Sequence, residues 1–421
     1  MKEQLNNSFL EKKLSRRSLL KAAGVGGAGI VIGASGFGGV MAAMGGRSFV
    51  DDNHTSMNKI NFYGSHQPGI ATKNPLHVYF VSLNCIAKSK QELKDLFLAW
   101  TEDSVRLMNG ETKPNSSNNL LPPHDTGEAE GLDASNLTLT FGVGPSLFEK
   151  AELGLQNKKP KELKDLPHFP KDQLDPLYVG GDLCIQACAD DPQVAFHAVR
   201  NLIRTARGKV TMRWSQAGFN SYPTDSQGKK KTPRNLFAFK DGTINPNLDN
   251  KQEMDEVVWV QQGDSMDWLT GGTYLIARRI QMHLETWDRT ALIEQEATFG
   301  RHRESGALLG KTSEFDEIEK NENINQLLPP DSHVFLARQV QDRIFRRSFS
   351  YCDGIHPDTG AFDAGLLFIS FQKRPEQFIS IQASLGRLDK MNEYVTHRGS
   401  AIFACFPGVE KGSYLGAKLI D

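Results

Sequence analysis

Apolar and polar residues alternate along several short stretches in the first half of the chain, and two longer stretches have a helical repeat instead. Strict alternation indicates a strand with one buried face, whereas apolar residues spaced three or four apart indicate an amphipathic helix. The stretch 192–208 begins with Pro192 and ends with Gly208, which are typical helix boundaries. The order strand, helix, strand, strand, helix, strand is expected at residues 76–83, 89–109, 137–144, 182–189, 192–208 and 210–219. This is the order of a ferredoxin-like unit.

The second half of the chain repeats this order. The same six elements are expected at residues 273–284, 285–298, 346–351, 365–372, 375–391 and 401–406. Polar, proline-containing segments separate them and are expected to be loops, at residues 110–135, 155–180 and 301–332. We therefore predict an α+β protein made of two tandem, duplicated ferredoxin-like units, with residues 61–240 in the first unit and 241–421 in the second.

The first 46 residues have the composition of a targeting segment. A basic stretch contains Arg16 and Arg17, and the uncharged, Gly- and Ala-rich residues 22–46 follow it. The sequence SRRSLLK resembles a twin-arginine export signal, and a membrane anchor after a chance arginine pair is the alternative. That resemblance implies passage of the folded protein through the twin-arginine translocase to a periplasmic or extracellular location. Ala42 and Ala43 offer a cleavage site, and residues 47–60 are expected to be a linker.

Composition narrows the class of protein further. The chain has 421 residues, a formal net charge of -1 and 24% charged residues, so nothing favours a nucleic-acid partner bound by bulk charge. Five cysteines are too few for a disulfide framework. Cys184 and Cys188 lie in the apolar strand 182–189, where buried core thiols are expected rather than a metal pair or a disulfide.

Three stretches carry candidate chemistry. Asp241 is followed by Gly242 in residues 233–246, a basic loop occupies residues 300–309, and His333 begins an apolar run that a pair of arginines follows at 346 and 347. Taken singly, these features are typical of a turn, a solvated loop and a core histidine.

Together, the three stretches resemble the dye-decolourising haem peroxidases, especially their exported deferrochelatase branch. That family has the motifs GxxDG, GRxxxxGAP and SHxRxA, followed by an arginine pair, and the resemblance extends over residues 60–410. The chain departs from the motifs at three positions, where it has Ala238, Leu308 and Phe335. These departures affect contacts in the haem pocket, while the acid, the histidine and the arginine pair are retained.

The resemblance implies a fold, a cofactor and roles for individual residues. The fold is a tandem pair of ferredoxin-like units of the dimeric α+β barrel type, and the cofactor is haem b. His333 is implied as the ligand of the haem iron. Asp241 is implied as the acid on the peroxide side and Arg346 as the arginine beside it, with Arg347 as a structural neighbour. Further haem contacts are expected from Gly242, Thr243, Ile244, Arg338 and Arg346.

The resemblance also implies the reaction and its partners. Hydrogen peroxide is reduced and an external donor is oxidised, and release of iron from haem for a membrane iron-uptake system is a second activity of the same pocket. A non-catalytic, exported haem-binding or haem-carrier protein is the alternative, although a carrier needs neither Asp241 nor Arg346. The oligomeric state stays open, with a homo-oligomer among the alternatives.

Overall fold

The computed structural model describes residues 58–421 except 74, 115–116, 229 and 319–321. The predicted export segment 1–46 and most of the predicted linker 47–60 lie outside this part of the chain. Among the helices that the structure describes, none has the length and apolar composition needed to cross a membrane.

All six elements predicted for the first half are present. They are β1 (His77–Cys85), α2 (Lys90–Met108), β2 (Thr138–Val143), β3 (Leu183–Ala189), α3 (Pro192–Thr205) and β4 (Val210–Phe219). Both helices begin at a side-chain cap, because Ser89 accepts a hydrogen bond from the N–H of Glu92, and Asp191 accepts bonds from the next turn of α3. The capping residues explain why the starts of the helices could be predicted closely.

The second half contains the predicted elements with two corrections and several additional short elements. Its strands are β5 (Thr273–Met282), β6 (Phe345–Arg346), β7 (Phe349–Ile355), β8 (Phe362–Gln372), β9 (Val395–His397) and β10 (Ala401–Cys405). Its helices are α4 (Lys251–Val257), α5 (Leu284–Asp288), α6 (Leu292–Phe299), α7 (Ile324–Leu327), α8 (His333–Arg338), α9 (Pro375–Leu388) and α10 (Ala417–Ile420). Short 3-10 helices lie at Pro145–Glu149, Ala151–Leu153, Gln156–Lys158, Pro176–Tyr178, Asp267–Leu269 and Lys390–Glu393.

The prediction of one helix over 285–298 was wrong, because the chain breaks between α5 and α6. The side-chain amide of Gln295 donates to the carbonyl oxygens of Trp287 and Thr290, which satisfies backbone groups that a continuous helix would have paired. The prediction of one strand over 346–351 was also wrong. There the chain forms β6 and then β7, which pair with different parts of β8.

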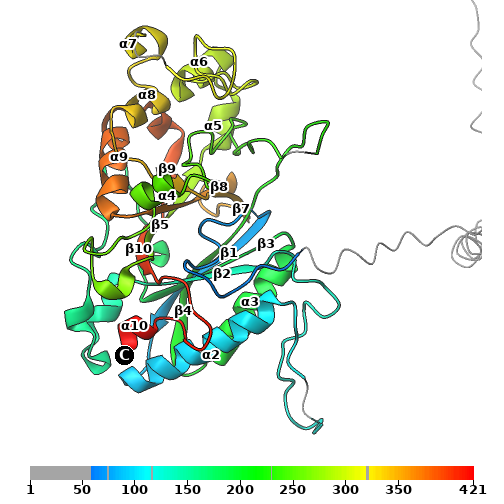
Figure 1. The fold of residues 1–421 in the computed structure, drawn as a ribbon. Coiled ribbons are helices and arrows are strands. Elements are labelled where there is room, and N and C mark those ends of the chain that lie inside the picture. Colours follow the sequence, from blue (N-terminus) through cyan, green and yellow to red (C-terminus); the bar gives the residue numbers. More distant parts are fainter. Residues whose placement is uncertain (1–57, 74, 115–116, 229, 319–321) are drawn as a thin grey trace, which may run out of the picture. The chain divides into compact units, whose positions relative to one another are not determined.

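The strands close into a barrel that the two halves share (Figure 1). The first half contributes the neighbours β4, β1, β3 and β2, and the second contributes β10, β5, β8 and β7, so both halves have the same internal strand order. Antiparallel pairing of β2 with β10 and of β4 with β7 joins them. This repeated order confirms the duplicated ferredoxin-like fold. The boundary predicted at residues 240 and 241 stays a prediction, since the described residues between 220 and 250 form no helix and only isolated bridges.

Alternating strand residues separate an inner core from an outer core. On β1, Val78 and Phe80 belong to the cluster inside the barrel, while Val81 packs with the residues of α2 and α3. Cys184 and Cys188 also lie in the inner cluster as free thiols, which confirms the prediction of buried core cysteines. Apolar clusters therefore lie on both sides of the sheet.

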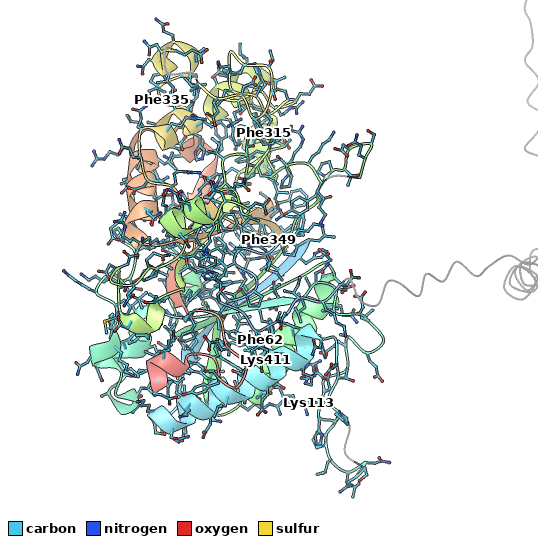
Figure 2. The ribbon with its side chains drawn as sticks, viewed as in Figure 1. Phe62, Lys113, Phe315, Phe335, Phe349 and Lys411 are labelled. Carbon is cyan, nitrogen blue, oxygen red and sulfur yellow. The ribbon has the colours of Figure 1, made fainter. Side chains whose placement is uncertain are left out.

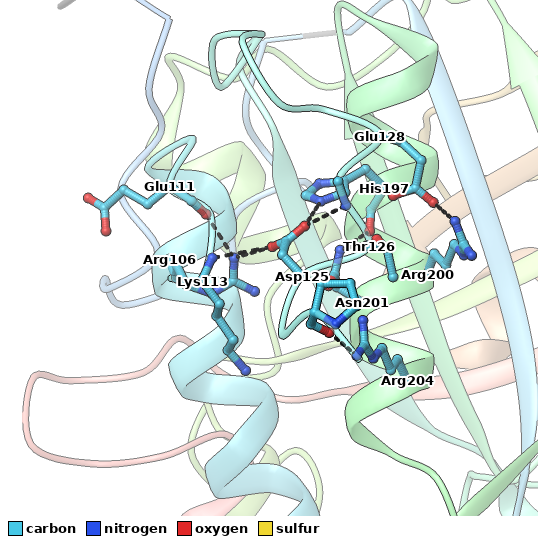
Figure 3. A network of polar contacts seen from close by, with 12 residues as sticks. Arg106, Glu111, Lys113, Asp125, Thr126, Glu128, His197, Arg200, Asn201 and Arg204 are labelled. Atoms are coloured by element: carbon cyan, nitrogen blue, oxygen red, sulfur yellow. Dashed lines mark hydrogen bonds and ion pairs between the residues drawn. The ribbon is translucent and has the colours of Figure 1, made fainter. Parts of the chain in front are cut away.

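The long segment 110–135 is attached to α2 and α3 through a buried carboxylate (Figure 3). Asp125 accepts hydrogen bonds from His197 at 2.7 Å and from Arg106 at 3.0 Å, and its side chain is 6% exposed. Glu128, three residues further on, pairs with Arg200 of α3. Burial alone would raise the pKa of Asp125, but the bonds from His197 and from nearby backbone N–H groups lower it to about 2.

Replacing Asp125 by asparagine should lower the free energy of unfolding at pH 7 by about 2 kcal/mol, since each pKa unit corresponds to about 1.4 kcal/mol. The pKa of this carboxyl is depressed in the folded state, so its stabilisation is complete above the unfolded value of roughly 3.9. The difference in stability between wild type and variant should therefore shrink as pH falls from about 4 toward 2. Urea unfolding at several pH values measures it. Asp95→Asn, an exposed change on α2, should show no comparable difference.

Candidate active site

Asp241 and Arg346 form an ion pair at the wall of a pocket. Nη1 of Arg346 lies 3.0 Å from Oδ1 of Asp241, and the two side chains are 29% and 21% exposed. The pocket has a cavity volume of about 40 Å³ and is lined mainly by the loop 220–245 and by residues 346–350. Two charged groups that are partly buried and face a small pocket can act on a small polar molecule there.

His333 begins α8 and is oriented by a carboxylate that comes from a different element. Its Nδ1 lies 2.6 Å from Oδ2 of Asp389, which directly follows α9 and also accepts a hydrogen bond from the N–H of Met391. Burial lowers the pKa of His333, whereas the charge and the hydrogen bond of Asp389 raise it. The net result is a pKa above the usual value for histidine. A carboxylate at Nδ1 fixes the ring and leaves Nε2 as the nitrogen for a metal.

The side chain of His333 keeps an uncovered surface. It lies deep in the protein, and yet a third of its side-chain surface, 33%, is uncovered. No hydrogen bond joins its Nε2 to any residue that the structure describes. Asp241 and Arg346 are near enough for their charges to affect the pKa of His333. A nitrogen ligand with an uncovered face beside a charged pocket fits an iron porphyrin.

Several arginines place positive charge around the same region. Arg301 is 6% exposed, and burial together with the charges of Arg338 and Arg346 lowers its pKa to about 10, against a smaller opposing effect of Glu314. Burial also lowers the pKa of Arg338, at the end of α8. Of the three arginines, Arg301 is buried, Arg346 is partly buried and paired with Asp241, and Arg338 is exposed. They fit a group that brings anionic carboxylates, as the two propionates of haem do.

The three residues that follow Asp241 differ in their surroundings. Gly242 lines the pocket with a φ of +99°, a conformation that favours glycine. The hydroxyl of Thr243 donates to Glu314 at 3.0 Å, and Glu314 also binds Lys240. Ile244 is 46% exposed, as several other large apolar side chains of this chain are. The structure thus brings Gly242 to the pocket, while Thr243 ties this loop to residues 301–316.

The three departures from the family motifs have structural explanations. Ala238 stands where the motif has glycine and adopts a φ of +68°, a left-handed conformation that favours glycine. Leu308 and Phe335 pack in one small apolar cluster beside α8, in which Phe335 is labelled in Figure 2. Two of the three departures from the motifs, Leu308 and Phe335, therefore lie in the same apolar cluster.

The structure brings together the main residues predicted from the sequence and adds others. Asp241, Arg346 and Gly242 share the pocket, and His333 lies within electrostatic range of it. Arg347 also lines this pocket, is 4% exposed and donates to the carbonyl oxygen of Thr72, and its role as a structural neighbour stays a prediction. Sequence reasoning missed Asp389, and it quoted Arg301 only as part of a loop motif.

Comparison with known proteins identifies the family of the chain. The profile of the Dyp-type peroxidase N-terminal domain matches residues 67–220, and that of the C-terminal domain matches residues 232–410. The deferrochelatases of Escherichia coli (strain K12) and Shigella sonnei (strain Ss046) are each 36% identical over 369 residues, covering 85% of this chain and 86% of theirs.

Solved structures agree with this result. Ferric DtpA from Streptomyces lividans is 34% identical with a TM-score of 0.78, over 87% of this chain and 99% of that chain. A DyP-type peroxidase from Cellulomonas bogoriensis is 34% identical with a TM-score of 0.77, over 86% of this chain and 98% of that chain. The chain belongs to the Dyp-type peroxidase family, and it is a haem peroxidase whose cofactor is haem b.

Proposed function

We propose that the protein reduces hydrogen peroxide at a haem held by His333, with Asp241 and Arg346 on the peroxide side. The observation that carries this proposal is the 3.0 Å pair of Asp241 and Arg346 in one small pocket within electrostatic reach of His333. When bound, haem b supplies the redox-active iron, and the protein supplies orientation and charge. Two electrons from the external donor and two protons convert one peroxide to two waters.

Asp241 and Arg346 divide the work of cleaving the peroxide. The carboxylate of Asp241 accepts a proton from the peroxide and returns it to the oxygen that leaves as water. The positively charged guanidinium of Arg346 stabilises the negative charge that develops on the leaving oxygen. The two groups lie 3.0 Å apart in the structure, close enough to act on the same peroxide molecule.

The remaining candidates hold the cofactor. His333 would provide Nε2 to the iron, and the Asp389 carboxylate orients the ring and increases its basicity. Gly242, Thr243 and Ile244 would contact the porphyrin. Arg338, together with Arg301, would bind the propionates.

The size and lining of the pocket favour electron donors that react without entering it. A cavity of about 40 Å³ with several charged and amide side chains admits peroxide or water but not a dye-sized molecule. A non-catalytic haem carrier is the alternative, but such a protein has no use for an acid and an arginine paired beside the haem.

Release of iron from haem is the second candidate activity. It is favoured by the 36% identity, over 85% of the chain, to proteins named deferrochelatase. In that reaction the iron leaves and two protons take its place on the porphyrin nitrogens. An exported protein with this activity would supply a membrane iron-uptake system.

One experiment separates these functions. Purified holoprotein is mixed with peroxide and a dye, and separately with added haem, and the porphyrin products are identified by mass spectrometry. Peroxide-dependent oxidation of the dye supports the peroxidase, and iron-free protoporphyrin supports iron release. Haem that is returned unchanged, with no dye oxidised, would leave only the carrier.

Export should depend on the two arginines at 16 and 17. Replacing both by lysine keeps the charge but removes the guanidinium geometry, so the precursor should accumulate in the cytoplasm with several-fold less exported protein. Cell fractionation and immunoblotting measure the distribution, with replacement of Lys12 and Lys13 by arginine as the matched control. Normal export of the double-lysine variant would show that another route is used.

A further inference from the structure

Asn245 makes two hydrogen bonds to the backbone of one residue, Arg346. Its side-chain Nδ2 donates to the carbonyl oxygen of Arg346 at 2.8 Å, and its Oδ1 accepts the N–H of Arg346 at 3.0 Å. Arg346 lies in β6, a strand of two residues at the end of the sheet order, which pairs with β8 on one side. The amide of Asn245 therefore acts on the other side as a neighbouring strand would, and satisfies both backbone groups of Arg346.

The backbone around Asn245 fixes the position of its side chain. The N–H of Asn245 donates to the carbonyl oxygen of Gly242 at 3.3 Å, which closes a turn directly after Asp241. Gly242 has a φ of +99°, which a residue with a side chain rarely adopts. Pro246 follows and restricts Asn245 to extended conformations. Asp241 itself is held by its N–H bond to the carbonyl oxygen of Pro233 at 3.0 Å.

These contacts form a closed ring. Asp241 leads through a four-residue turn to Asn245, whose amide binds the backbone of Arg346, and the guanidinium of Arg346 returns to the carboxylate of Asp241 at 3.0 Å. We propose that Asn245 is a positioning residue for the reaction with peroxide, which sets the separation and direction of the Asp241 carboxylate and the Arg346 guanidinium. This inference rests on the roles proposed for those two residues.

The chemistry of the amide explains why asparagine is needed at this position. The carbonyl oxygen of Arg346 needs a donor and its N–H needs an acceptor, and one side-chain amide supplies both at a fixed spacing. An aspartate has nearly the same shape, but when ionised it only accepts, and it would set an oxygen against the carbonyl oxygen of Arg346. Alanine leaves both backbone groups of Arg346 without this partner.

The expected effect lies in the peroxide step. A small misplacement of reacting groups can cost up to roughly a hundredfold in rate, so Asn245→Ala and Asn245→Asp should react with peroxide about 10- to 100-fold more slowly than wild type. No contact joins Asn245 to His333 or Asp389, so haem content and the ferric Soret band should not change. In steady state, kcat/KM should fall for peroxide and stay unchanged for the reductant.

A double-mutant cycle on the holoenzyme tests the coupling. Stopped-flow mixing with peroxide gives the rate of the Soret change for wild type, Asn245→Ala, Asp241→Asn and the double variant. If Asn245 acts through the pair, its replacement should cost much less in the Asp241→Asn background, because groups that act together are not additive. Equal losses in both backgrounds, or a wild-type rate for Asn245→Ala and Asn245→Asp, would overturn the proposal.

Two controls separate positioning from stability and from the proposed function. Asn250→Ala removes the side chain that caps α4 by accepting the N–H of Glu253. That change should lower the unfolding temperature and leave the peroxide rate unchanged. A slow Asp241→Asn with a normal Asn245→Ala overturns only the role of Asn245. An Asp241→Asn variant that reacts at the wild-type rate overturns the role of Asp241 and this inference with it.

Discussion

Replacing His333 by alanine should release the haem. The side chain offers an Nε2 without any partner among the described residues and an Nδ1 fixed at 2.6 Å by Asp389, the arrangement of an oriented metal ligand. Loss of an outer partner of such a ligand costs about 10- to 100-fold in metal affinity, and loss of the ligand itself should cost at least as much. The Soret absorbance per polypeptide of purified His333→Ala should fall accordingly.

The matched control is a second histidine in a family motif. His302 is 41% exposed at its side chain and pairs with Glu296 at 2.9 Å, so His302→Ala should keep its haem. Asp389→Asn should weaken haem binding by about 10- to 100-fold and alter the spectrum of the haem that stays bound, because the ring loses its charged partner but not its metal-binding nitrogen. An unchanged ferric spectrum in His333→Ala would move the ligand to another histidine, and His302 would be the first to examine.

The elements that depend on local signals could be predicted from the sequence. Strands β1, β3 and β4 follow from alternation and β-forming residues, and α3 follows from Pro192 and a helical repeat that ends near Gly208. The same local order, repeated in the second half, was enough to predict two ferredoxin-like units. What local order cannot specify is the pairing of β2 with β10 and of β4 with β7, which closes the barrel across about 130 to 260 residues of chain.

The site could be predicted only where a motif names its residue. Asp241, His333 and Arg346 were found because they lie in sequence motifs of a known family, although each has an ordinary structural explanation when taken alone. Asp389 and Asn245 had no such signal, because their roles arise from contacts to residues 56 and 101 positions away. The helix α8 was missed because its six residues are too few to show a repeat.

Replacing Arg346 by leucine should slow the reaction with peroxide by about a hundred- to a thousandfold, while haem stays bound. A lost preorganised donor of this kind costs about 2.7–4 kcal/mol of barrier. The guanidinium acts through its charge and not through a transferable proton, so the loss should be the same at every pH. Arg343→Leu, which removes a more exposed arginine paired with Glu253, is the matched control and should react normally.

Asp241→Asn should behave differently from Arg346→Leu, because the carboxylate acts through a proton that it must give up and take back. The amide keeps the size of the side chain but cannot relay a proton, whereas water or hydroxide can substitute in part at some pH values. The loss in Asp241→Asn should therefore vary with pH and be smaller than that of Arg346→Leu over part of the range. Stopped-flow spectra of both holoproteins, mixed with peroxide across the pH range, measure the two profiles. Formation of the peroxide-dependent spectrum by Arg346→Leu at the wild-type rate would contradict the role of Arg346, and would direct attention to Arg347 beside it.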